Sequence, residues 1–364
     1  MKKQALIGTS KGLVVYDFSS TPTLESVHFA GYSVNQTYVD QRSGRWWIGV
    51  SHKHWGQKLH YSDNEGSSWE TAKIPSYEGA LLPDGRKAKL KQIWSIAAGG
   101  VRREEVLWVG TEPGGLFKSE DFGKSFELVD GLWNHPSRKD NTAWFGAGTD
   151  QPFIHSINVH PENHRHLYAS VSCAGVFETK DEGLNWSPKN NGLIAAYLPN
   201  PKAEYGHDPH KVILHPKDPN ILWQQNHCGV FLSRDAGSSW QDVSNHDGLP
   251  SYGFGIVVDE EDPARAWVIP VESDEKRVAP DLKLRVLRTD DYGTNWNDDS
   301  EGLPADSVFD IVLRHAFDRT GDLMVFGTNN GNLFFKRDSD DRWHKVTTHL
   351  SKINSVITYK LTNL

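Results

Sequence analysis

Histidine is the residue type in this sequence that is best suited to catalysis or metal binding. The chain contains 17 histidines, and several stand in short polar stretches such as SHKHW, FIHS, GHDPHK and QNHC. A neutral imidazole is both a general base and a metal ligand near physiological pH. These stretches are therefore the first places to look for catalysis or metal binding.

Four histidines from separate parts of the chain are candidates for one metal site, namely His54, His155, His210 and His227. Three or four imidazoles with a Gln or an Asp suit Zn or Mn, and the ion would polarise a carboxylate or hydroxyl group of a substrate. No H-E-x-x-H motif fixes the geometry. The alternative is therefore that these histidines are hydrogen-bonded structural residues.

Polar and aromatic residues near these histidines, together with two carboxylates, are candidates for substrate binding. They are His54, Trp55, Lys211, Gln225, Glu112 and Asp150. The two cysteines, Cys173 and Cys228, occupy equivalent turns of neighbouring repeats, and we expect both to be packed as small apolar residues.

A repeated motif indicates how these residues are positioned. It reads SDNEGSSW from Ser62, SEDFGKSF from Ser119, TKDEGLNW from Thr179, SRDAGSSW from Ser233 and TDDYGTNW from Thr289. Its spacing of about 55 residues is typical of propeller and array repeats. A motif with five copies is expected to build the fold and not a single active site.

The residue types of the motif predict a tight turn. Its Asp, such as Asp235, can accept backbone N–H groups in an Asx turn. Its Gly, such as Gly237, tolerates a positive φ, and the aromatic residue three positions later can pack on a neighbouring sheet. Each copy is therefore predicted to close a β-hairpin between the third and fourth strands of a repeat.

Strand patterns flank each motif. Units such as VGTEPGGLFKS and QQNHCGVFLS read as strand, glycine turn and strand, and alternating apolar runs such as FIHSINVHP precede them. Each repeat therefore predicts a four-stranded antiparallel blade, and seven blades result if the units around 8–18 and 336–343 are included. Residues 353–362 are predicted to join the strands of 5–29 and so close the ring. The prediction is an all-β, seven-bladed β-propeller forming a single domain, 1–364.

The SxDxGx(S/T/N)W boxes and GTxxGLF units resemble those of the BNR, or Asp-box, propellers. This resemblance covers nearly the whole chain. It implies membership of a superfamily with sialidases, xyloglucan-cleaving hydrolases, sorting receptors and a photosystem assembly factor, so it does not imply one function. Sialidases of this kind have an Arg-Ile-Pro signature near the first blade and an arginine triad. The first strands here read ALIGTSKGLVV, without Arg, so sialidase activity is not expected.

Long insertions predict the location of the site. They cover 78–92, 128–155, 187–210 and 272–285, and loops of this length in a compact domain are often functional. Turns of a four-stranded meander alternate between two faces. The insertions and the GTxxG turns therefore share the face opposite the boxes, where we expect a His-rich pocket.

Two reactions and one non-catalytic role fit this pattern. A glycosidase would use a pair of carboxylates, for which the candidates are Glu112, Asp150, Asp208 and Asp310. A lyase acting on a uronic-acid sugar, similar to metal-containing propeller lyases, needs a base, a proton donor and a cation for the carboxylate. The candidates are His155 or His210 as base, Tyr205 or Tyr252 as donor, and Arg277 or Arg285 as cation. The alternative is a rigid scaffold that binds a protein or a saccharide.

The composition limits the classes of binding partner that we expect. A net charge of −8 argues against nucleic acid, and no apolar stretch is long enough for a membrane span or typical of a secretory signal. Two cysteines cannot build a disulfide framework. We therefore expect a cytoplasmic protein whose ligand is a small saccharide or another small molecule.

Overall fold

The structure, a computed structural model, describes residues 2–52, 54–139, 143–146, 148–245 and 248–360. Almost all regular structure in these residues is β. The helical segments among them are the four-residue helix α1 (Asp130–Trp133) and two 3-10 turns, η1 (Pro136–Lys139) and η2 (Pro280–Leu282). The all-β prediction is confirmed.

The packing of the Cα trace divides the chain into two compact units. Unit 1 comprises Met1–His52, Tyr61–Trp69 and Val243–Leu364, and unit 2 comprises Lys53–His60 and Glu70–Asp242. Each is described by itself below.

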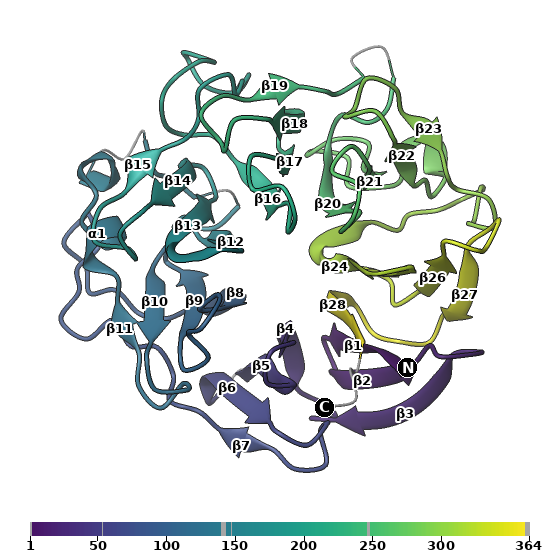
Figure 1. Ribbon diagram of the computed structural model, residues 1–364, viewed down its shortest axis with the longest axis horizontal. Coiled ribbons are helices and arrows are strands. Elements are labelled where there is room, and N and C mark those ends of the chain that lie inside the picture. The colour runs from purple at the N-terminus through teal and green to yellow at the C-terminus, as the bar shows by residue number, and fades with distance from the viewer. Residues whose placement is uncertain (1, 53, 140–142, 147, 246–247, 361–364) are drawn as a thin grey trace. The chain divides into compact units, whose positions relative to one another are not determined.

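Three four-stranded antiparallel sheets lie within unit 2, and the strands of each run side by side in Figure 1. The first sheet contains β8 (Gln92–Ala98), β9 (Leu107–Glu112), β10 (Leu116–Ser119) and β11 (Glu127–Leu128). The second contains β12 (Ile154–His160), β13 (Asn163–Val171), β14 (Gly175–Thr179) and β15 (Ser187–Pro188). The third contains β16 (Pro209–Leu214), β17 (Leu222–Asn226), β18 (Gly229–Ser233) and β19 (Gln241–Asp242).

Unit 1 contains a four-stranded sheet and an eight-stranded sheet. The four strands are β20 (Gly253–Val258), β21 (Ala266–Pro270), β22 (Leu287–Thr289) and β23 (Asn297–Asp298). The eight strands, in spatial order, are β27 (His344–Thr347), β26 (Leu333–Arg337), β25 (Leu323–Thr328), β24 (Val312–Thr320), β28 (Ile353–Lys360), β1 (Lys3–Thr9), β2 (Gly12–Asp17) and β3 (Thr23–His28). A further four-stranded sheet has the order β4 (Ser33–Asp40), β5 (Arg45–His52), β6 (Gly56–Ser62) and β7 (Glu70–Thr71).

The two ends of the chain pair as predicted. Strand β28 pairs antiparallel with β1, with Tyr359 opposite Gln4 and Val356 opposite Ile7. The N-terminal strands therefore gain an inner strand from the C-terminal end. Residues 361 and 362 of the predicted strand lie outside the described residues.

Burial explains the composition of the strands. All six residues of β9 are buried, because both faces of this strand are covered, and its sequence LWVGTE is correspondingly apolar. In unit 2 the core around it contains Trp108, Phe177 and Trp186. The fourth strands β7, β11, β15, β19 and β23 are only two residues long, so each leaves only a short unpaired edge that could pair with another chain.

The boxes are the predicted turns between third and fourth strands. In the copy from Ser233, Asp235 Oδ1 accepts the Ser233 hydroxyl and the Ser239 N–H, each at 2.8 Å. Gly237 has φ 77°, and Ala236 before it also has a positive φ, 55°, which the sequence did not indicate. Trp240 Nε1 donates to the Lys189 carbonyl at 2.7 Å, just after β15 of the preceding sheet. This copy of the motif thus closes its own hairpin and links it to the neighbouring sheet.

Among the described residues, no helix is long and apolar enough to cross a membrane.

Candidate active site

Bulges in the first strands of the unit 2 sheets position two of the predicted histidines. The register between β12 and β13 shifts between Ile154 and Ser156, which leaves His155 as the extra residue. The register between β16 and β17 shifts in the same way between Pro209 and Lys211, which leaves His210 as the extra residue. A bulge re-aims the side chain at which it occurs, so both imidazoles leave the alternating pattern of their strands.

Asp208 directly precedes β16, and three imidazoles lie around its buried carboxylate. His210 Nε2 lies 3.3 Å from Asp208 Oδ2, and His227 Nδ1 lies 3.7 Å from the same oxygen. His155 Nε2 lies 3.6 Å from Asp208 Oδ1. The nitrogen and oxygen atoms of Asp208, His210 and His227 that could bind a metal all lie within 4.8 Å of one another. We refer to Asp208, His155, His210 and His227 as the His–Asp cluster.

The Asp208 carboxylate is ionised despite its burial. It is 2% exposed, and burial alone would raise its pKa. The electrostatic interaction with His210, together with the nearby imidazoles of His155 and His227, holds the pKa of Asp208 well below its usual range. The backbone also fixes this residue, because the His227 N–H donates to the Asp208 carbonyl at 2.9 Å and the Cys173 N–H donates to Oδ1 at 3.3 Å.

Aromatic rings hold the imidazoles in place. The His155 ring lies 4.5 Å from the Phe153 ring, which in turn stacks on Trp94 at 4.1 Å. Trp94 is itself the extra residue of a bulge in β8, between Ile93 and Ser95. On the other side, the Tyr197 ring lies 5.1 Å from the His227 ring, and its hydroxyl donates to the Gly206 carbonyl at 2.8 Å. Burial and the charge of Asp208 raise the pKa of Tyr197, so the phenol keeps its proton.

Two further predicted residues, Glu112 and Asp150, share a lysine. Lys91 Nζ lies 3.6 Å from Glu112 Oε1 and 3.6 Å from Asp150 Oδ2. Glu112 is buried and also accepts Trp94 Nε1–H at 3.3 Å. Burial raises the pKa of Glu112. Because Trp94 contacts the rings of Phe153 and His155, the Glu112 carboxylate is connected to the His–Asp cluster through one indole.

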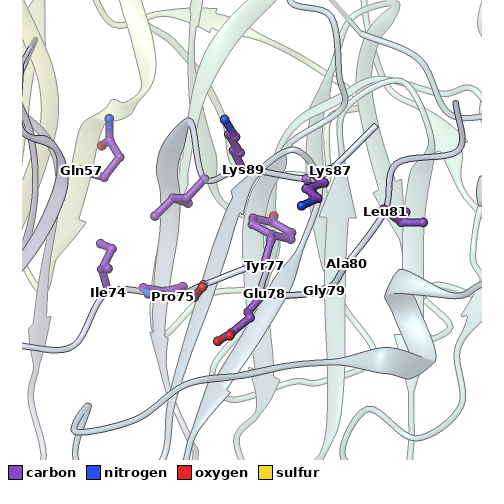
Figure 2. A pocket seen from close by; sticks show the side chains of 13 residues that line it. Gln57, Ile74, Pro75, Tyr77, Glu78, Gly79, Ala80, Leu81, Lys87 and Lys89 are labelled. Carbon is purple, nitrogen blue, oxygen red and sulfur yellow. The ribbon is translucent and has the colours of Figure 1, made fainter. Parts of the chain in front are cut away.

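The insertion between β7 and β8 lines a cavity in unit 2. This cavity has a volume of about 540 Å³ and a mainly apolar lining that includes Ile74, Tyr77 and Leu90. Figure 2 shows Gln57, Ile74, Tyr77 and Lys89 around this space. Tyr77 is buried, and it anchors the insertion by accepting the Gly115 N–H at 3.0 Å.

The other predicted residues of unit 2 lie in varied surroundings. Lys211 is half-buried on β16 and pairs in register with Gln225, whose amide donates to the carbonyls of Asn226 and Gly229. His54 and Trp55 lie on the exposed turn between β5 and β6, where Trp55 is 74% exposed. Tyr205 packs on His135 and Phe177. The binding and catalytic roles of these residues stay predictions.

Three candidates for the lyase reaction belong to unit 1. Tyr252 is buried against Phe254, and the Arg277 guanidinium lies 5.6 Å from the same Phe254 ring. Arg285 donates to the Pro280 carbonyl at 2.8 Å and to Asp281 at 2.9 Å, which holds the turn η2 together. Asp310, the fourth carboxylate candidate, accepts Asn332 Nδ2–H at 2.7 Å. Participation of these residues in one site with the His–Asp cluster stays a prediction.

Sequence reasoning did not identify the aromatic supports of the site. Trp94 and Tyr197 lie in an alternating strand and in a polar loop, where nothing in the residue pattern distinguishes them from packing residues. Asp208 was expected as a carboxylate candidate for glycoside hydrolysis and as a neighbour of the histidines, but not as the residue at the centre of the imidazoles. The useful signal was the spacing of Asp208 and His210, which brackets the start of a strand.

Comparison with known proteins identifies the fold only. No protein-family model matches the chain, and no curated protein matches it. Among solved structures, a candidate 6-phosphogluconolactonase from Bacteroides fragilis is 12% identical, with a TM-score of 0.61 over 99% of this chain and 98% of that protein. YCF48 from Cyanidioschyzon merolae is also 12% identical, with a TM-score of 0.55 over 92% of this chain and 95% of that protein.

An ancestral GH74 enzyme is 15% identical and has a TM-score of 0.54 over 90% of this chain. This chain spans only 38% of the length of that enzyme. All three proteins are β-propellers, and the four-stranded antiparallel sheets described above agree with that architecture. At these identities the likeness concerns the fold alone.

Proposed function

We propose that this chain is a carbohydrate-active enzyme whose reaction centre is the His–Asp cluster with a divalent metal. The observation that carries the proposal is the convergence of Asp208, His210 and His227 at one point inside unit 2. One carboxylate and two imidazoles are a common donor set for Zn or Mn, and three protein ligands leave a position for substrate.

The spacing of these atoms supports a metal. Tetrahedral coordination at about 2.0–2.1 Å separates neighbouring ligand atoms by about 3.3–3.4 Å. The contacts of 3.3 Å and 3.7 Å from Asp208 to His210 and His227 are close to this value. They are longer than the usual N–H···O hydrogen bond of about 2.7–3.2 Å.

Each residue of the cluster has a role in this proposal. A bound cation would act as a Lewis acid on a carboxylate, carbonyl or hydroxyl group of the substrate. His155, oriented by Phe153 and Asp208, would take a proton from water in hydrolysis or from the carbon next to a carboxylate in elimination. Tyr197 keeps its phenolic proton and would donate a hydrogen bond beside His227.

The proposal includes the finer features of the fold. The pairing of β28 with β1 and the hydrogen-bonded geometry of the boxes support a seven-bladed Asp-box propeller that closes as one domain. The structural neighbours, which include GH74 glycoside hydrolases and a candidate 6-phosphogluconolactonase, support a saccharide as the proposed substrate class. We propose a small saccharide as substrate, a cytoplasmic location, and no nucleic-acid or membrane partner.

Elemental mass spectrometry of the untagged protein tests the metal site. We expect near-stoichiometric Zn or Mn in the wild type and metal binding that is weaker by at least about tenfold in His227→Ala. The matched control is His166→Gln, because His166 also contacts a carboxylate, Glu178, at 2.7 Å but lies outside the cluster. Absence of metal from the wild type, or equal metal in wild type and His227→Ala, would overturn the proposal.

Activity is then assayed on uronic-acid oligosaccharides and on neutral ones. New reducing ends without a double bond indicate hydrolysis, and an ultraviolet-absorbing unsaturated product indicates elimination. Loss of either activity in His155→Ala with unchanged metal content is the expected result. Saccharide binding without turnover in the metal-loaded wild type would contradict the enzyme proposal and favour the non-catalytic scaffold.

A second candidate reaction rests on Glu112 and Asp150. Since each lies 3.6 Å from Lys91 Nζ, their nearest oxygens are at most twice that distance, 7.2 Å, apart. Glycosidases use carboxylates about 5–9.5 Å apart, one of them protonated. The raised pKa of buried Glu112 suits the acid, and exposed Asp150 suits the base or nucleophile. Hydrolysis that is lost in Glu112→Gln but survives metal removal would favour this candidate.

A further inference from the structure

A separate cavity of about 250 Å³ in unit 2 is lined by an arginine that is itself buried. Arg138 lines it together with Arg86, Trp144, Asp150 and Pro152. Drug-sized ligands occupy pockets of roughly 300–1,000 Å³, so this cavity suits a smaller molecule, of about the size of a monosaccharide. Its lining combines two guanidinium groups and the carboxylates of Asp84 and Asp150 with an indole.

Arg138 is buried without a carboxylate partner among the described residues. It is 4% exposed. Its guanidinium donates to the carbonyls of Gly114 at 3.2 Å and Pro113 at 3.0 Å. It also stacks on Trp133 at 3.8 Å and lies 5.1 Å from Trp144. Burial lowers the pKa of Arg138 to about 10, so the group still carries its charge at neutral pH.

The carboxylates of the cavity wall are paired with other cations. Asp84 lies 2.7 Å from Arg86, and Asp150 lies 3.6 Å from Lys91. Carbonyl oxygens solvate the Arg138 charge but do not neutralise it, and a buried charge without a counter-ion is unfavourable. The wall thus has two cations, Arg86 and Arg138, and two carboxylates, Asp84 and Asp150, and of the two cations Arg138 is the one without a carboxylate contact among the described residues.

We propose that this cavity binds the anionic group, a carboxylate or a phosphate, of a small acidic sugar. Arg138 is the principal cation, and Arg86, which also pairs with Asp84, is a second one nearer the surface. A planar guanidinium matches both oxyanions with two parallel hydrogen bonds. Trp144 provides an apolar wall for the sugar ring.

The cavity lies close to the His–Asp cluster along the chain. Pro152 lines it, and Phe153 contacts the His155 ring. The three-residue step from Pro152 to His155 spans at most about 11 Å. An acidic sugar anchored at Arg138 could thus present its ring toward His155. This link to catalysis rests on the function proposed above, whereas anion binding itself does not.

Titration calorimetry with glucuronate, glucose 6-phosphate and glucose tests the proposal, with EDTA present throughout. Metal is thereby removed, so failure of the metal hypothesis cannot be mistaken for failure of anion binding. We expect at least one acidic sugar to bind at least tenfold more tightly than glucose. Tighter binding of glucuronate identifies a carboxylate ligand, and tighter binding of glucose 6-phosphate identifies a phosphate ligand. Equal affinity for all three sugars would overturn the proposal.

Two variants localise the binding. Arg138→Gln should weaken the binding of the preferred acidic sugar at least tenfold and leave the affinity for glucose unchanged. Arg86→Gln should weaken the binding of the acidic sugar about threefold. Because Arg86 is exposed, we expect this variant to fold, so it tests the location of the binding site if Arg138→Gln does not fold. The matched control is Arg342→Gln, an exposed arginine that also contacts an acidic residue, Glu301, at 3.6 Å. Equal affinity in Arg86→Gln and Arg342→Gln, with no loss in folded Arg138→Gln, would exclude this cavity as the binding site.

Discussion

Asp235 and Asp208 are both aspartates of unit 2 with lowered pKa values, but their partners come from different parts of the chain. Asp235 is bound by Ser233 and Ser239, within four residues of its own position. Asp208 is bound by imidazoles from β12, from β16 and from the turn after β17. Asp235 lies in an exposed turn, and Asp208 is buried.

The difference separates a structural carboxylate from a functional candidate. A box can form in any hairpin that contains its eight residues, so the chain can repeat it. The His–Asp cluster needs three elements to be in place first, and it surrounds a charged group with side chains that can also bind a metal or transfer a proton. The predictions below test this distinction.

Asp208→Ala should have the largest effect on stability. Removing a buried carboxylate from its charged partners costs about 3–5 kcal/mol. Urea denaturation of the metal-free protein measures this loss. A decrease of less than 1 kcal/mol would show that Asp208 does not organise the cluster.

Glu178 provides a histidine–carboxylate contact without a metal site. Burial would raise its pKa, but His166 and Lys189 lower it to about 2. The pKa of Glu in an unfolded chain is about 4.3. The folded state therefore gains stability from Glu178 above pH of about 4, and it loses this contribution as the pH falls toward about 2.

Glu178→Gln should consequently be less stable than wild type at neutral pH, and the difference should disappear near pH 2. Thermal melts across this range measure the effect, and the metal content should stay at the wild-type level. Loss of metal in this variant would mean that the contacts of histidine with carboxylates do not distinguish the two regions.

Asp235→Ala should lower the free energy of unfolding by about 1–2 kcal/mol, because its turn is weakened. The hydrogen bonds to Ser233 and Ser239 are lost, but the strands on both sides remain. Activity per folded molecule should not change. A decrease in kcat at unchanged stability would show that the boxes have a role beyond the fold.

Trp55→Ala should have the smallest effect on stability, within about 0.5 kcal/mol, because the side chain is 74% exposed. If Trp55 binds saccharide as predicted, KM should rise while the melting temperature stays constant. An unchanged KM would remove Trp55 from the binding residues.

The pattern of strands and boxes was predictable because it depends on neighbours in sequence. Asp235, Gly237 and Trp240 stand at fixed offsets, and their turn forms from local hydrogen bonds and a local positive φ. The histidines near the chain's polar turns were also identifiable, since their types and spacing are visible in the sequence.

The grouping of the site residues was less predictable. His54 and His155 were placed in the metal set with His210 and His227, but the group of possible ligand atoms in the described residues has Asp208 in place of those two histidines. The bulges at Trp94, His155 and His210 have no clear residue signature, yet they determine where these side chains are directed.

The sequence by itself therefore determined the β class, the repeat and the turns of this protein. Local hydrogen bonding and the alternation of apolar residues are sufficient for those features. The tertiary structure alone decided that Asp208 contacts the three imidazoles and that Arg138 lacks a carboxylate partner among the described residues. Both facts depend on strand register and on burial, which arise from contacts between residues far apart in the chain.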